Sequence, residues 1–328
     1  MGKALSAPSI FQLGYYWNAK IFLTSVRLDL YTAIAGGAGT AEEIAAEIKA
    51  DPSFLRRMLD ALVEIGLLKR EGPNYLNTPP VAEFLVRTSA FYTGELMLLQ
   101  DEEWDHWGKL EKIIRSGQPA VKGNIFMNRP ESGANVLKVL HRMAKRVAPT
   151  LAERIDLSSY QSFIDVGGGA GTFSVAFCKH YPHLKAVLFD LPQTLEVTRK
   201  TIESENLADQ IQLAGGNFNR DPLPGKYDVV FLSDILHYQT FDENAALFRK
   251  LFQAVNPGGM IIVKDMFIND DINNPGWNAI FSMHMLVYSE KGQCYKGEEI
   301  RFWLEKAGFK NIVEVERNTV LTASKSSF

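Results

Sequence analysis

The sequence is long enough for two domains and nearly balanced in charge: its 328 residues carry 35 Lys and Arg against 38 Asp and Glu, a formal net charge of −3. This balance argues against nucleic acid or another polyanion as the main partner. A hydrophobic share of 46% is ordinary for a globular protein.

The cysteines and the apolar runs bear on the compartment. Cys178 and Cys294 are the only cysteines, so no disulfide framework is indicated and a reducing cytoplasm is expected. No secretory leader is recognised, and no apolar run reaches the length that spans a membrane. We therefore expect a cytoplasmic protein without membrane contact.

The N-terminal part of the chain predicts several helices. From Ile10 to Leu30, apolar side chains recur on both faces of a helical pattern, which indicates burial on more than one side, either in a dimer or in an ordinary monomer. Thr40 and Glu43 have the spacing of a capping box at the start of the next helix. Asp51 followed by Pro52 marks another start, with Asp as N-cap.

Residues 67–77 predict a short hairpin, so the local order is helix, helix, hairpin, as in a winged helix. A winged helix that binds DNA usually shows a concentrated basic face. Here the second helix offers only Arg56 and Arg57, and the hairpin only Lys69 and Arg70. We therefore expect a structural or dimerising role, with no nucleic acid as partner.

Two further segments lead to the second domain. Trp104 lies among acidic residues and either faces a ligand cleft or is buried in an amphipathic helix. A helical pattern over residues 132–155 predicts a bridge between domains. The expected division is a mainly helical, winged-helix-like dimerisation domain over 1–130, a linker helix over 131–156 and a second domain over 157–328.

The second domain begins with an apolar run that ends in an acid and breaks into a glycine turn. Such a strand, turn and helix start lets a ligand lie on the glycine backbone and face the helix N–H groups. A dinucleotide fingerprint would need a third glycine where Thr172 stands. An acid followed by alternating glycines is the other template, and it is filled completely by Asp165, Gly167, Gly169 and Gly171.

Polar residues follow the next predicted strands, at the edge where open α/β sheets bind ligands. Asp190 ends the second strand, where it would accept hydrogen bonds from ribose hydroxyls or, alternatively, cap a helix. Asn217 and Phe218 follow the third strand and would contact the edge and the face of adenine. His237 follows the fourth strand, over residues 227–232, where chemistry is expected.

The rest of the chain predicts the fold class. A fifth strand over residues 260–263 precedes Asp265, and residues 309–315 and 319–323 predict a terminal antiparallel hairpin. A doubly wound α/β sheet with such a hairpin favours the methyltransferase fold over a plain dinucleotide fold. Residues 276–290 predict a lid or pocket helix. Candidate pocket residues are Trp104, Met143, Trp277, Phe281, His284 and Met285.

Several motifs occur in the order and spacing of one family. They are residues 165–171, 189–192, 215–218, 236–237 before 242–243, and 256–259. Over its whole length the sequence resembles the S-adenosylmethionine (SAM)-dependent small-molecule O-methyltransferases of the caffeate and acetylserotonin type and their bacterial relatives. The resemblance implies a class I, Rossmann-like catalytic domain and an N-terminal domain that builds a homodimer. It implies SAM, with S-adenosylhomocysteine as product, and no metal.

The resemblance also implies a role for each matched position in cofactor binding. The glycine turn would hold the methionine part of SAM. Asp190 would bind the ribose, Asn217 and Phe218 would bind the adenine, and Leu191 is expected to contact the cofactor. Ser233 is expected to be a further cofactor contact.

At the catalytic positions the resemblance implies His237 as general base, oriented by Asp265. The sequence departs from the family nearby. Tyr238 follows the histidine where the family often has Asp, Cys294 stands where a second supporting acid would fall, and Ser233 stands where Lys or Arg is common. These departures affect the base more than the cofactor site.

The expected activity is methyl transfer from SAM to a hydroxyl of an aromatic or conjugated small molecule. The alternatives are N- or C-methylation of a small molecule mainly by proximity, a non-catalytic SAM-binding regulator, and a nicotinamide dehydrogenase. Metal catalysis is not expected, because His180 and His183 do not form a ligand cluster with orthodox spacing.

Overall fold

The computed structural model describes residues 7–121, 126 and 130–327. Their contacts divide the chain after Gly108 into two compact units. Among the described residues, the helices are all too short or too polar to cross a membrane.

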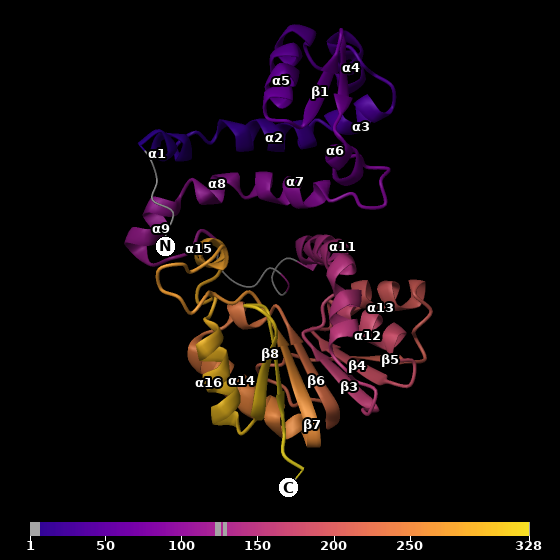
Figure 1. Cartoon of the computed structure of the whole chain (residues 1–328), viewed down its shortest axis with the longest axis vertical. Coiled ribbons are helices and arrows are strands. Elements are labelled where there is room, and N and C mark those ends of the chain that lie inside the picture. Colours follow the sequence, from indigo (N-terminus) through magenta and orange to yellow (C-terminus); the bar gives the residue numbers. More distant parts are fainter. Residues whose placement is uncertain (1–6, 122–125, 127–129, 328) are drawn as a thin grey trace. The chain divides into compact units, whose positions relative to one another are not determined.

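The N-terminal unit consists of helices and one small hairpin (Figure 1). The Thr40 side chain accepts a hydrogen bond from the Glu43 amide, and Asp51 accepts hydrogen bonds from the amides of Ser53 and Phe54. The two predicted helix caps and the predicted antiparallel hairpin are therefore confirmed. The elements are α1 (Ala7–Leu13), α2 (Trp17–Arg27), α3 (Leu30–Ala35), α4 (Ala41–Ile48), α5 (Pro52–Glu64), β1 (Leu68–Glu71), β2 (Asn74–Asn77), α6 (Pro79–Phe84), α7 (Gly94–Glu102) and α8 (Trp104–Trp107).

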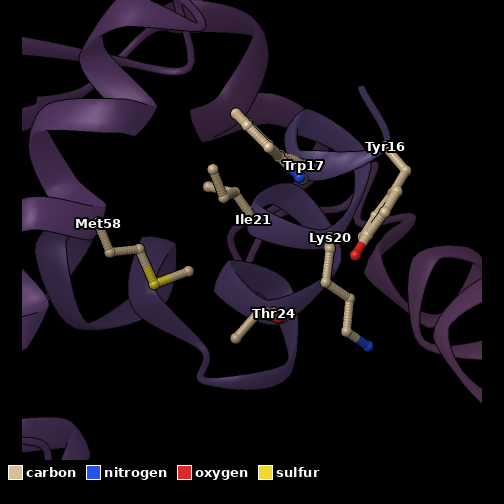
Figure 2. A pocket seen from close by; sticks show the side chains of 6 residues that line it. All are labelled: Tyr16, Trp17, Lys20, Ile21, Thr24 and Met58. Carbon is tan, nitrogen blue, oxygen red and sulfur yellow. The ribbon is translucent and has the colours of Figure 1, made fainter. Parts of the chain in front are cut away.

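The beginning of this unit leaves an unusual amount of apolar surface open. Six large hydrophobic side chains between residues 10 and 17 are each 57–74% exposed in a single chain: Ile10, Phe11, Leu13, Tyr15, Tyr16 and Trp17. A hollow of about 270 Å³ lies beside them, with Met58 of α5 facing residues of α2 across it (Figure 2). Its lining residues are Tyr16, Trp17, Lys20, Ile21, Thr24 and Met58. Contiguous apolar surface of this kind marks an interaction site.

The second unit is built on a seven-stranded sheet of order β5-β4-β3-β6-β7-β9-β8. The strands from β5 to β7 are parallel, and β9 pairs antiparallel with both β7 and β8. This arrangement confirms the predicted doubly wound sheet with a terminal hairpin. The strands are β3 (Ser162–Val166), β4 (Lys185–Asp190), β5 (Ile211–Gly215), β6 (Tyr227–Ser233), β7 (Val255–Lys264), β8 (Lys310–Glu316) and β9 (Val320–Ser324).

Helices cover both faces of this sheet, with α11, α12 and α13 on one side and α14 and α16 on the other (Figure 1). Side chains of β6 alternate between the two cores: Val229 and Phe231 pack on one face, Val230 and Leu232 on the other. The helices are α9 (Leu110–Ser116), α11 (Pro130–Arg154), α12 (Thr172–His180), α13 (Leu195–Ser204), η1 (Leu236–Tyr238), α14 (Phe241–Ala254), α15 (Asn278–Tyr288) and α16 (Gly297–Ala307).

The helix predicted as a linker over 131–156 is α11, which packs against α12 and α13 of the second unit. The contacts divide the chain after Gly108 rather than near residue 130, because α9 and α11 both contact elements of the second unit. The limits 1–130, 131–156 and 157–328 stay a prediction about the domains.

The strand order changes direction at β3. From β3 the chain first builds outward through β4 and β5, and then returns to add β6 and β7 on the opposite side. Ligands of open α/β sheets bind at such a switch point, outside the carboxyl ends of the strands. A ligand site is therefore expected at the carboxyl ends of β3 and β6.

Candidate active site

The glycine turn follows β3 directly and needs glycine for its backbone. Gly167, Gly169 and Gly171 have φ values of 73°, 55° and 81°, in the left-handed region that side chains disfavour. A Cβ atom on Gly167 would lie 2.9 Å from Cγ2 of Ile235. The turn therefore touches the segment that follows β6, so the ends of β3 and β6 meet as the topology requires.

The carboxylate of Asp165, on β3 just before the glycine turn, is buried. Asp165 is 1% exposed, and its Oδ2 accepts a hydrogen bond of 2.6 Å from the Ser174 hydroxyl of α12. Its Oδ1 is buried without a hydrogen-bond partner among the described residues. Burial raises the pKa of Asp165 to about 7, and the nearby charge of Asp190 adds to this effect. An unsatisfied buried acid beside a glycine cradle fits a cationic ligand with N–H donors.

Asp190 connects the end of β4 to the same turn. Its Oδ2 accepts a hydrogen bond of 2.7 Å from the Gly169 amide, and its Oδ1 accepts one of 2.6 Å from the Leu191 amide. Burial raises its pKa, and these amide hydrogen bonds counteract the rise. The carboxylate is thus held at the strand ends with oxygen lone pairs that remain able to accept from a ligand.

Asn217 and Phe218 come from the turn after β5. The Asn217 side-chain oxygen accepts a hydrogen bond from the backbone amide of Asn219. The backbone amide of Asn217 donates a hydrogen bond to the Asp221 carboxylate. Phe218 lies against the glycine turn, because a Cβ on Gly167 would be 3.4 Å from its Cε1. The structure therefore brings Phe218, Asp190 and the glycines together along one edge of the sheet.

His237 and Asp265 form a buried pair at the ends of β6 and β7. The Nδ1 atom of His237 lies 2.6 Å from Oδ1 of Asp265, and the two residues are 4% and 3% exposed. The amides of Leu236 and Met266 donate to the same carboxylate at 2.8 Å. With its carboxylate fixed in this way, Asp265 accepts a hydrogen bond from the Nδ1–H group of His237, which leaves Nε2 as the basic nitrogen.

The electrostatics of this pair make His237 a stronger base than an ordinary histidine. Burial alone would lower the pKa of His237, but the charge and hydrogen bond of Asp265 outweigh it and hold that pKa above its usual value. Burial likewise opposes ionisation of Asp265, whereas His237 and the backbone amides keep its pKa below the usual range. The pair can therefore accept a proton and hold it.

An aromatic wall from α15 stands beside His237. The Phe281 ring lies 5.4 Å from the His237 ring, edge to face, and it stacks on both Trp277 and His284. Burial lowers the pKa of His284 to about 4, and the charge of His237 contributes, so this second histidine is neutral near pH 7. Met285 is 2% exposed and belongs to the packed side of the helix.

Met143 and Trp104 are the two remaining candidate pocket residues. Met143 of α11 is 44% exposed. Trp104 belongs to the N-terminal unit, where its ring contacts Tyr16 edge to face and the Lys20 ammonium at 4.8 Å. Their roles in a pocket stay predictions. Ser233 of β6 donates a hydrogen bond to a neighbouring acid, Asp234, and its role toward the cofactor likewise stays a prediction.

Sequence reasoning missed three residues of this region. Ser174, which donates to Asp165, is the third residue of α12, and its contact crosses the glycine turn, so no periodic pattern connects the two residues. Leu137 of α11 lies 3.2 Å from the position of a Cβ on Gly169. Lys264 precedes Asp265 directly, but its contacts depend on strand register, which no sequence pattern reveals. No group of three or more potential metal ligands occurs in the described ranges.

Comparisons with known proteins show the family of this chain. A model of the O-methyltransferase domain matches residues 117–310, and one of the O-methyltransferase dimerisation domain matches residues 12–88. The tetracenomycin polyketide synthesis 8-O-methyl transferase TcmO of Streptomyces glaucescens is 33% identical over 303 residues, which cover 90% of this chain and 89% of that protein. The 3-hydroxy-5-methyl-1-naphthoate 3-O-methyltransferase of Streptomyces sahachiroi is 29% identical over 304 residues, or 90% and 87% of the two chains. A solved O-methyltransferase family protein from Burkholderia thailandensis is 27% identical, covers 99% of both chains and has a TM-score of 0.89.

The sheet, the glycine turn and these matches define the class as SAM-dependent methyltransferases with the class I fold. The chain belongs to the O-methyltransferase family. Its cofactor is SAM, and the matched dimerisation domain supports formation of a homodimer.

Proposed function

We propose that this enzyme transfers a methyl group from SAM to a hydroxyl of an aromatic, polyketide-type small molecule, with His237 as general base. The observation that carries the proposal is the buried His237–Asp265 pair at the end of β6, in a segment that contacts the glycine turn. The two relatives, an 8-O-methyl transferase of tetracenomycin polyketide synthesis and a 3-hydroxy-5-methyl-1-naphthoate 3-O-methyltransferase, support the substrate class. Mass spectrometry and nuclear magnetic resonance of the product formed with isotope-labelled SAM test the proposal.

The residues around the glycine turn suit SAM, which carries an ammonium and a sulfonium charge. The turn and the unsatisfied Oδ1 of Asp165 would hold the methionine part. Asp190 and Leu191 would hold the ribose, with Asn217 and Phe218 at the adenine. Bound SAM would supply an electrophilic methyl group, so the chain itself needs to position an oxygen nucleophile and manage its proton.

His237 would handle that proton. A phenol has a pKa of about 10, so few molecules are ionised near pH 7 and a nearby base makes the oxygen a better nucleophile. The neutral imidazole would take the phenolic proton at Nε2, while the Asp265 carboxylate keeps its hydrogen bond to Nδ1 and stabilises the resulting imidazolium. Phe281 and Trp277 would offer a flat apolar surface to the ring of the acceptor.

SAM affinity should depend on pH through Asp165. The pKa of this acid is about 7 in the ligand-free protein, and a cationic ligand favours its ionised form. Affinity should therefore increase, by up to about tenfold, as pH rises from about 6 to about 7.5. Calorimetric titration of SAM checks this, with Asp165→Asn as the variant that should lose the pH dependence. An equal dependence in both proteins would contradict the role given to Asp165.

The exposed apolar residues of α1 and α2 would form part of the homodimer surface. Phe11 and Trp17 are 71% and 60% exposed in one chain, and residues 12–88 match the dimerisation domain. Phe11→Asp combined with Trp17→Asp would place two charges in that surface, so we expect the monomer to predominate in light-scattering chromatography. Ile272→Asp, at an exposed apolar residue of the second unit, is the control that should stay dimeric. A double variant that elutes as an unchanged dimer would place the interface elsewhere.

A further inference from the structure

A lysine and an acid meet beside the proposed base, where β6 and β7 end. The register pairs Ser233 of β6 with Lys264 of β7. The Lys264 ammonium donates a hydrogen bond of 2.6 Å to Oδ2 of Asp234, and the Ser233 hydroxyl donates one of 2.8 Å to the same oxygen. The Lys264 side chain is 17% exposed and the Asp234 side chain 40%, so the lysine is the more buried partner of this ion pair.

Asp234 has a backbone conformation that calls for support. Its φ is 55°, in the left-handed region that residues other than glycine adopt uncommonly. Its amide also donates a hydrogen bond of 2.8 Å to the Lys264 carbonyl. Asp234 is therefore held to Lys264 by both its backbone and its side chain. The chain leaves β6 at this residue and reaches His237 three positions later.

Lys264 also contacts the helix that follows the glycine turn. Its ammonium lies 5.4 Å from the centre of the Phe173 ring, in a cation–π contact. Phe173 is the second residue of α12. Lys264, at the end of β7, therefore contacts both the segment that leads to His237 and the first turn of α12, the helix that follows the glycine turn.

We propose that Lys264 and Asp234 are positioning residues for His237: the pair fixes the left-handed turn from β6 into η1, and its two opposite charges act against each other on the imidazole. The inference rests on the proposed function in taking His237 as the base. The hydrogen-bond distances, the strand register and the left-handed backbone of Asp234 support this role. The two charges make the role measurable through the pKa of His237.

The groups around His237 allow a prediction of sign. Asp265, which follows β7 directly, and Asp234 both favour the imidazolium and raise its pKa, whereas Lys264 disfavours it and lowers that pKa. His284 of α15 is neutral near pH 7, because burial lowers its pKa to about 4. Cys294, next to Asp265, stays a neutral thiol because burial raises its pKa to about 12. In the intact pair, the effects of Lys264 and Asp234 on the pKa of His237 oppose each other. Substituting one residue would leave the effect of the other unopposed.

Nuclear magnetic resonance of histidine-labelled enzyme measures this balance directly. The chain has six histidines, and His237→Gln identifies the signal of the base. We expect Lys264→Met to raise the pKa of His237, and Asp234→Asn to lower it, each by roughly 0.5 pH unit. Asparagine matches aspartate in size and tolerates the left-handed conformation. Lys200→Met removes a lysine from an exposed surface pair with Glu196 and should change nothing.

Activity gives the second readout. The midpoint of the acidic limb of kcat/KM should move to higher pH in Lys264→Met and to lower pH in Asp234→Asn, and Lys264→Arg should restore it. Lys264→Gln removes the same charge with a polar side chain, and it replaces the methionine variant if that variant does not fold. Shifts in the same direction for both substitutions, or no shift, overturn the proposal.

Two further outcomes separate this inference from the proposed function. A higher KM for SAM in Lys264→Met, with the pKa of His237 unchanged, would assign the lysine to the cofactor and overturn the inference alone. If the pKa values move as expected but His237→Ala keeps its turnover, the charge pair stands and the role of His237 as base falls.

Discussion

Replacing His237 with alanine should lower kcat by about 10²–10⁴-fold and leave SAM affinity within about a factor of two. The imidazole is buried, and its Nδ1 is committed to Asp265 at 2.6 Å, so Nε2 is the basic atom available to a substrate hydroxyl. Removing it leaves a neutral phenol as nucleophile, with positioning by the rest of the site intact. Single-turnover rates and calorimetric SAM titration separate the two quantities.

Asp265→Asn tests the same pair from its other side. Asparagine keeps the size and can still accept from Nδ1, but it no longer compensates the imidazolium, so the pKa of His237 should fall toward or below its usual value. The acidic limb of the rate profile then moves to lower pH while the maximum rate drops.

A loss of less than about tenfold in His237→Ala would mean that transfer proceeds by proximity, without a general base.

Replacing Gly169 with valine should weaken SAM binding by more than about 100-fold. The residue has φ of 55°, which a β-branched side chain does not adopt readily. Its amide donates to Asp190, and a Cβ would press on Leu137 of α11 at 3.2 Å. The substitution therefore disturbs the cradle, the carboxylate proposed for the ribose and the neighbouring helix together.

A matched control separates backbone strain from loss of the site. Gly72, in the hairpin of β1 and β2, has φ of 58° and open space where a Cβ would lie. Gly72→Val carries a similar conformational penalty in the other unit, so it should lower the melting temperature and keep SAM affinity. If Gly169→Val bound SAM almost normally in the same titration, the glycine turn would not be the cofactor cradle.

Much of the fold is written in local sequence patterns. The caps at Thr40 and Asp51, the buried strand at 227–232 and the terminal hairpin are all features of a few neighbouring residues, and each is present in the structure. The division after Gly108 was not predicted, because it depends on the contacts of α9 and α11 with elements of the second unit rather than on any break in composition.

The candidate site divides in the same way. His237 and Asp265 are separated by 28 positions, yet each follows a recognisable parallel strand, so their meeting could be expected from topology. The contact of Lys264 with Asp234 could not, because it requires the register of β6 on β7 and a left-handed residue. Trp104 lies in the N-terminal unit, where its ring contacts Tyr16 and Lys20, and its role in a pocket stays a prediction.

Methyl transfer from isotope-labelled SAM into phenols and polyketide-type aromatics, followed by mass spectrometry and nuclear magnetic resonance of the product, tests the central claim most directly. The account predicts a product that carries one labelled methyl group on oxygen, formed at a rate that depends on His237. A labelled methyl on nitrogen or carbon would contradict the proposed O-methylation. Binding of NADH more tightly than SAM would contradict the reading of the glycine turn itself.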